Sequence, residues 1–133
     1  MKETEVAAWQ EIAFEEVCLQ HIEQIKHALQ IGGVSSRESA YVISGDAENA
    51  GTQIDLLIDR DDDVVNLCEI KYYKEPFTVS KSYNETLEHW KSLMQETFPG
   101  MTFHLTFIGS SGLNRTSYSD IFVSEVTAED LFV

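Results

Sequence analysis

The spacing of hydrophobic residues along the chain predicts an alternation of helices and strands. Apolar residues recur at helical spacing between residues 5 and 31, and Gly32 and Gly33 follow as the expected end of this helix. Three segments rich in apolar, β-branched or aromatic residues come next, so we expect strands at 39–44, 52–59 and 64–73. The polar residues 60–63 lie between the last two strands and predict a hairpin turn.

The second half of the chain continues this alternation. Residues 80–98 carry another helical stripe that ends at Pro99 and Gly100, and strands are expected at 101–108 and 121–126. The order α-β-β-β-α-β, followed by a short tail that includes residues 121–126, is typical of an α/β fold with a central mixed sheet flanked by helices. Since no repeat or linker-like stretch divides the sequence, we expect residues 1–133 to form one domain.

Size and composition are those of a globular domain. A chain of 133 residues, 43% of them hydrophobic, can bury a core without disulfides. Cys18 and Cys68 lie on predicted apolar faces without the spacing of a zinc site, so both are expected to be reduced and buried. The sequence has no apolar run near the ~20 residues that span a bilayer and no signal-peptide core, which predicts a cytoplasmic protein without membrane contact.

The charge of the chain limits how it could act on nucleic acid. Nine basic residues stand against 23 acidic ones, for a formal net charge of −14. A surface this acidic repels the phosphate backbone, whose binding normally depends on lysine and arginine. A local basic patch, a bound metal or another domain would have to supply the attraction.

Three charged residues stand inside the predicted hairpin, where strand interiors are normally uncharged. Glu69 and Lys71 are two positions apart and therefore point to the same face of the sheet. A turn centred near Asp62 would place Asp55 directly opposite Glu69, with Cβ atoms about 4.5–5.5 Å apart. Two carboxylates at that distance repel each other unless a cation or a proton lies between them.

This pattern favours a site for a hard divalent cation, Mg²⁺ or Mn²⁺. Such an ion takes carboxylate oxygens together with waters and substrate phosphates, and it could activate a water for attack on a phosphodiester. Lys71, on the same face, could stabilise the transition state. The simpler alternative is a solvated sheet face on which Glu69 and Lys71 form a surface pair worth less than about 1 kcal/mol.

Two further groups of residues are candidates. Glu15 lies at the edge of the first helical stripe and could reach inward over the sheet, or it could be an ordinary boundary residue. Lys74 and Lys81, with Tyr73, belong to a basic and aromatic cluster that could contact a nucleic-acid backbone. The alternative for this cluster is an ordinary loop with partly buried lysine stems.

Four sequence blocks, taken in order, carry a family resemblance: FEEVCLQHIEQIKHAL, GTQIDLLIDR, NLCEIKYY and SEVTAEDLF. Together they resemble the nuclease-like C-terminal domain attached to a group of bacterial AAA-type ATPases. Glu15, Asp55 and the run Glu69-Ile70-Lys71 are similar to the E…(P)D…(D/E)XK signature of the PD-(D/E)XK nuclease superfamily. Ile54 replaces the proline of that signature, Glu11 stands where related helices often have glycine, and the sequence has no P-loop.

The resemblance implies a restriction-endonuclease-like fold and a role for each matching residue. Asp55, Glu69 and the backbone carbonyl of Ile70 would hold the metal, and Lys71 would be the catalytic lysine. Glu15 would complete the acidic cluster, directly or through a metal-bound water. The implied activity is metal-dependent hydrolysis of nucleic acid, most simply as a DNA endonuclease.

Two alternatives stay open. The chain could be a catalytically weak or inactive module of the same fold that binds nucleic acid or an AAA-type ATPase partner, in cis or in trans, and apolar surface left by an absent ATPase domain could pair two copies as a homodimer. An unrelated acidic α/β interaction domain would instead leave Glu69 and Lys71 as isolated surface residues.

Overall fold

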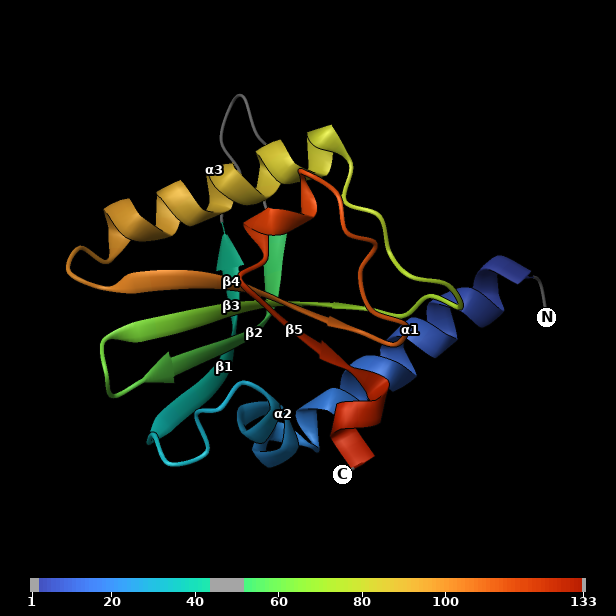
Figure 1. Cartoon of the computed structure of the whole chain (residues 1–133), viewed down its shortest axis with the longest axis horizontal. Helices are drawn as coiled ribbons and strands as arrows, with labels where there is room; N and C mark the ends of the chain where they lie inside the picture. The colour runs from blue at the N-terminus through green and yellow to red at the C-terminus, as the bar shows by residue number, and fades with distance from the viewer. Residues whose placement is uncertain (1–2, 44–51, 133) are drawn as a thin grey trace.

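A five-stranded mixed sheet forms the centre of the molecule, which is known from a computed structural model that describes residues 3–43 and 52–132 (Figure 1). The observed order of helices and strands, α-α-β-β-β-α-β-β, contains the predicted α-β-β-β-α-β core with its first helix divided in two and the tail forming a fifth strand, so the predicted α/β class is confirmed. The elements are α1 (Glu3–Leu19), α2 (Ile22–Ala28), β1 (Ser36–Ile43), β2 (Thr52–Arg60), β3 (Val64–Lys71), α3 (Lys81–Thr97), β4 (Thr102–Gly109), β5 (Ser124–Thr127) and the 3₁₀ turns η1 (Ser119–Ile121) and η2 (Ala128–Phe132).

The sheet has the strand order β1-β2-β3-β4-β5. β1, β2 and β3 are antiparallel neighbours, whereas β3, β4 and β5 run parallel. α3 packs on one face through buried side chains that include Leu87, Trp90 and Met94. α1 and α2 cover the other face, where Phe14 and Cys18 meet apolar residues of β2 and β3 (Figure 1). Because both faces of the sheet are covered, β3 is buried along nearly its whole length.

The prediction of one continuous helix over residues 5–31 is wrong, because the chain breaks at His21. Its Nδ1 lies 2.6 Å from the carbonyl oxygen of Val17, the acceptor that a continuing helix would offer to the His21 backbone N–H. The His21 backbone N–H donates instead to the carbonyl oxygen of Cys18, at 3.0 Å. α2 then ends through Gln30, whose φ of 63° takes the left-handed conformation expected of Gly32.

The two cysteines are buried and free, as predicted. None of the described helices is both long and apolar enough to cross a bilayer.

The β2–β3 hairpin has the predicted register. Leu56 pairs with Cys68 and Asp59 with Val65, so the turn is centred on Asp62. On its other side, β2 pairs with β1 through Ser39↔Leu57 and Tyr41↔Ile54. Between those two pairs, Asp55 and Leu56 face a single β1 residue, which makes a β-bulge.

Candidate metal site at the carboxyl edge of the sheet

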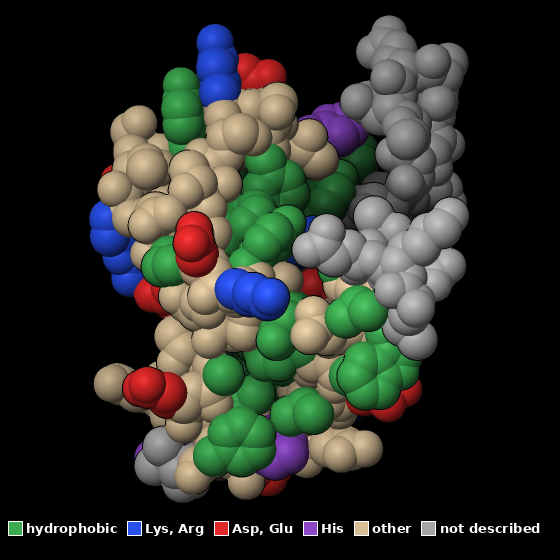
Figure 2. Space-filling view, turned by 90° about the vertical axis from the view of Figure 1, so that its right-hand side faces the viewer, with side chains coloured by type: hydrophobic (Ala, Val, Ile, Leu, Met, Phe, Trp, Pro, Cys, Tyr) green, Lys and Arg blue, Asp and Glu red, His purple; other side chains and the backbone are tan. Residues whose placement is uncertain are grey.

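The candidate site lies where the parallel strands β3, β4 and β5 end. All three strands run toward the right-hand side of Figure 1, where α1 and the loops after β3 and β4 lie. Figure 2 looks onto this side and shows hydrophobic side chains gathered across its middle, with single acidic and basic side chains among them. The carboxyl edge of a sheet of this kind is where ligands of α/β proteins usually bind.

Asp55 sits in the β2 bulge, at the point where regular pairing between β2 and β3 ends. Its Oδ2 accepts a hydrogen bond from the backbone N–H of Ile70, at 2.9 Å. Burial raises the pKa of Asp55, while this hydrogen bond and the nearby Lys71 oppose the increase. The bulge therefore places one carboxylate against the backbone between Glu69 and Lys71.

Glu69 is a buried carboxylate with an unfilled bonding position. Only 5% of the residue is exposed. Its Oε2 accepts a hydrogen bond from the Tyr83 hydroxyl at 2.7 Å, whereas its Oε1 is buried without a partner among the described residues. Burial raises the pKa of Glu69 to about 7, and Asp55 adds to the increase, although the Tyr83 hydrogen bond and Lys71 lower it. An orphaned carboxylate oxygen is costly, and a cation or a proton at Oε1 would remove that cost.

Lys71 lies on the same sheet face as Glu69, as predicted. Its Nζ is 5.8 Å from the centroid of the Tyr83 ring, within range of a cation–π contact. The same tyrosine thus contacts both Glu69 and Lys71 from the first turn of α3, which Ser80 caps by accepting the Tyr83 backbone N–H.

Removing the Tyr83 hydroxyl should weaken the fold most when Glu69 is ionised. We expect Tyr83→Phe to lower the free energy of unfolding at pH 8 by about 1–3 kcal/mol, because both Glu69 oxygens then lack a donor. At pH 5, where Glu69 is protonated, the loss should be smaller. Urea denaturation at both pH values measures this. Tyr118→Phe, at a ring 39% exposed, serves as the control, and an equal loss at both pH values would contradict the assignment.

Glu15 approaches the site from the other layer of the fold. It projects from α1, which covers the sheet face opposite α3, and it is half-buried while Glu16 is exposed. Burial and the neighbouring Asp55 raise the pKa of Glu15. The four predicted residues therefore meet at an edge, with Glu69 and Lys71 on one face, and do not all project from one side of the sheet.

Glu15 does not complete a three-carboxylate cluster with Asp55 and Glu69. Within residues 3–43 and 52–132, no three or more His, Cys, Asp or Glu side chains are grouped so as to hold a metal ion. Asp55 and Glu69 are the two carboxylates that lie beside the Ile70 backbone and influence each other's charge. Such a pair still fits Mg²⁺, which commonly takes one or two carboxylates and keeps several waters.

The sequence reasoning missed the roles of two residues. Glu11 accepts the backbone N–H of Tyr72 through Oε2 at 2.7 Å, and so fastens α1 to the chain that follows Lys71. Its position four residues before Glu15, on the same helix face, is a signal that could have found it. Tyr83 holds Glu69 through its hydroxyl, and the signal for this role is that a buried tyrosine normally needs a partner for that group.

The residues proposed for nucleic-acid contact lie on the loop between β3 and α3 and at the start of α3. Tyr73, Lys74 and Lys81 are exposed, as a contact surface requires. Tyr73 joins the site through aromatic contacts, because its ring lies 5.1 Å from that of Phe77, which in turn lies 5.7 Å from Tyr83.

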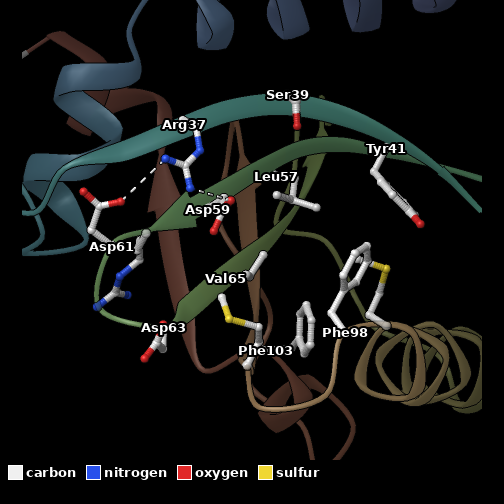
Figure 3. A pocket seen from close by; sticks show the side chains of 13 residues that line it. Arg37, Ser39, Tyr41, Leu57, Asp59, Asp61, Asp63, Val65, Phe98 and Phe103 are labelled. Carbon is white, nitrogen blue, oxygen red and sulfur yellow. Dashed lines mark hydrogen bonds and ion pairs between the residues drawn. The ribbon is translucent and has the colours of Figure 1, made fainter.

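A cavity of about 440 Å³ lies at the opposite end of the sheet (Figure 3). Leu57, Val65 and Phe103 contribute to its apolar lining, and Arg37 lies at its rim between Asp59 and Asp61, to which it is ion-paired. None of the candidate site residues lines this cavity, so it is separate from the carboxylate pair.

Comparison with known proteins supports the fold alone. No protein-family model and no curated protein matches the chain. A solved structure titled "Crystal Structure of Protein of Unknown Function AF1548" is similar, with a TM-score of 0.54 and 13% sequence identity. The match covers 86% of this chain and 64% of that protein, so the chain spans less than two thirds of its structural neighbour. This likeness extends to the arrangement of the sheet and helices.

Proposed function

We propose that this chain is a PD-(D/E)XK-type nuclease domain that hydrolyses phosphodiester bonds of nucleic acid with Mg²⁺ or Mn²⁺. The observation that carries the proposal is the orphaned Oε1 of Glu69, buried beside Asp55. A buried carboxylate pair with a free oxygen fits a hard cation, because the cation would remove both the repulsion and the unmet bond.

The residues present fit such an ion, and each would have a different role in catalysis. Asp55, Glu69 and the carbonyl of Ile70 would hold it, and when bound it would lower the pKa of a coordinated water and neutralise phosphate charge. Lys71 would stabilise charge on the phosphate, with its ammonium held over the Tyr83 ring. Glu15 would act through water, while Glu11 holds α1 against the strand end.

Cleavage assays with matched variants test this function. Single- and double-stranded DNA and RNA are incubated with the wild type and Mg²⁺ or Mn²⁺, and we expect Asp55→Asn to lose at least about 100-fold of the cleavage rate. Asp59→Asn, on the same strand at the hairpin end, should keep the wild-type rate. Calorimetric titration with Mg²⁺ should show binding by the wild type and none by Asp55→Asn. Folded protein that neither binds Mg²⁺ nor cuts any substrate would rule the nuclease out.

A catalytically inactive module of the same fold is the second candidate. The net charge of −14 favours it, since an isolated acidic domain holds DNA poorly. In that case an AAA-type ATPase domain, in cis or in trans, would bind the nucleic acid. Absence of cleavage, together with nucleic-acid binding that requires an added AAA-type ATPase domain and is unaffected by Asp55→Asn, would support this second function.

A further inference from the structure

We infer that the substrate is single-stranded nucleic acid, bound by base stacking on Tyr73 beside the carboxylate pair; this inference rests on the proposed function. The surface concerned consists of two loops, residues 72–80 and 110–118, and is called the rim here. Both loops leave the carboxyl ends of parallel strands, so the rim borders the candidate site.

Hydrogen bonds join the two loops of the rim. The Tyr73 backbone N–H donates to Ser110 Oγ at 2.8 Å, and the Tyr73 carbonyl accepts from the hydroxyls of Ser110 and Ser111. Phe77 and Asn114 add backbone bonds between the two loops, each 2.9 Å long. A side chain on a fixed backbone loses less entropy when it binds, so the rim is suited to holding a ligand.

An aromatic column leads from the rim to the site. Tyr73, Phe77 and Tyr83 contact one another in sequence, and the Tyr83 hydroxyl reaches Glu69. Phe77 also stacks on the buried Phe107, with ring planes 16° apart. Tyr73, at the outer end of this column, remains 48% exposed. An exposed aromatic ring on a rigid support is the surface on which unpaired bases stack.

The distribution of positive charge disfavours a duplex. Arg37, Arg60 and Arg115 are ion-paired with carboxylates, and Lys26 is buried and donates to a backbone carbonyl. Among the described residues, the basic side chains that lie at the site, on the rim or directly after it and form no such pair are Lys71, Lys74 and Lys81. Duplex binding commonly neutralises about 6–10 phosphates, whereas three lysines beside a stacking ring match a few nucleotides of single strand.

Binding experiments on a chain that cannot cut test the inference. In the full-length Asp55→Asn background, fluorescence anisotropy compares a labelled single-stranded DNA, the RNA of the same sequence, and the DNA duplex. We expect either single strand to bind at least about 10-fold more tightly than the duplex, and Tyr73→Ala to weaken single-strand binding about 10-fold. Phe98→Ala removes a 41% exposed ring at the far end of α3 and should leave binding unchanged. The single strand that binds more tightly, DNA or RNA, identifies the type of nucleic acid that this surface prefers.

Salt dependence provides a second, independent readout. Lys74→Ala should reduce the slope of log affinity against log salt by about 0.7, the value for one single-strand phosphate contact. Lys91→Ala, in the middle of α3, should not change it.

Equal or tighter binding of the duplex, or no effect of Tyr73→Ala, would overturn the inference. Metal-dependent cutting confined to duplex would overturn it and leave the nuclease proposal intact. Single-strand binding that requires Tyr73, in a wild-type chain that cuts nothing, would overturn the nuclease proposal and the assignment of a substrate, and would leave Tyr73 as part of a binding surface for single strands.

Discussion

Glu69→Gln should make the metal-free protein more stable at pH 8 by up to about 3 kcal/mol, although it removes a residue of the candidate site. The pKa of Glu69 is raised from 4.5 to about 7 in the folded protein, chiefly by burial. Below pH 4.5 the carboxyl is protonated in both the folded and the unfolded chain. Between pH 4.5 and 7 the folded chain binds the proton more tightly, so the free energy of unfolding falls as the pH rises. Above pH 7 the full penalty of a buried anion remains.

The measurement is urea denaturation of wild type and variant from pH 4.5 to pH 8.5 without metal. The difference in unfolding free energy should grow over that range and then level off, because glutamine does not titrate. Glu85→Gln removes an equal charge from the exposed face of α3 and should give a difference that does not vary with pH. If the difference in unfolding free energy between Glu69→Gln and the wild type also did not vary with pH, the pKa of Glu69 would not be raised in the folded protein.

The same experiment separates stability from function. Adding Mg²⁺ at pH 8 should stabilise the wild type, because a ligand bound only by the folded state raises its stability. The variant should gain nothing from Mg²⁺ if Glu69 is a ligand. A residue of a functional site is expected to lower the stability of the metal-free protein and yet be needed for binding the metal.

The hairpin part of the candidate site could be predicted from the sequence because its geometry is local. A short polar turn between two strong strands fixes the register, and that register brings Asp55 to the level of Glu69. Lys71 follows from the two-residue period of a strand. The bulge at Asp55 was not predicted, since it depends on β1, whose pairing with β2 is set across the sheet.

The supporting contacts could not be predicted, because they join residues that are far apart or belong to different layers. Glu11 reaches Tyr72 across 61 positions of the sequence, from a helix on the opposite face to α3. The break at His21 has a different cause. The helical spacing of apolar residues continues through it, but one side chain competes with the backbone for the Val17 carbonyl.

Phe107→Ala should destabilise the protein by about 3–5 kcal/mol, the cost of emptying a large buried site. Phe107 is fully buried in β4, and its ring contacts both Phe77 and Phe122. The ring also lies over Gly109, where an added Cβ would come within 2.3 Å of Phe107 Cε1. The loss of this ring leaves a cavity directly beneath the rim. Urea denaturation at pH 7 gives the magnitude, and Phe107→Leu provides a milder variant if the alanine form does not fold.

The effect of Phe107 on the rim can be distinguished from a general loss of core stability. Phe103 is equally buried in the same strand and on the same sheet face, but it lies at the other end, beside the cavity of Figure 3. Phe103→Ala should therefore cost a similar amount of stability. Amide hydrogen exchange should separate the two variants, because Phe77 and Asn114, whose N–H groups join the two loops, should lose protection only when the ring beneath Phe77 is removed. Equal exchange at these amides in both variants would mean that the rim keeps its order without Phe107. Packing of Phe77 on Phe107 would then not be what keeps the two loops of the rim together.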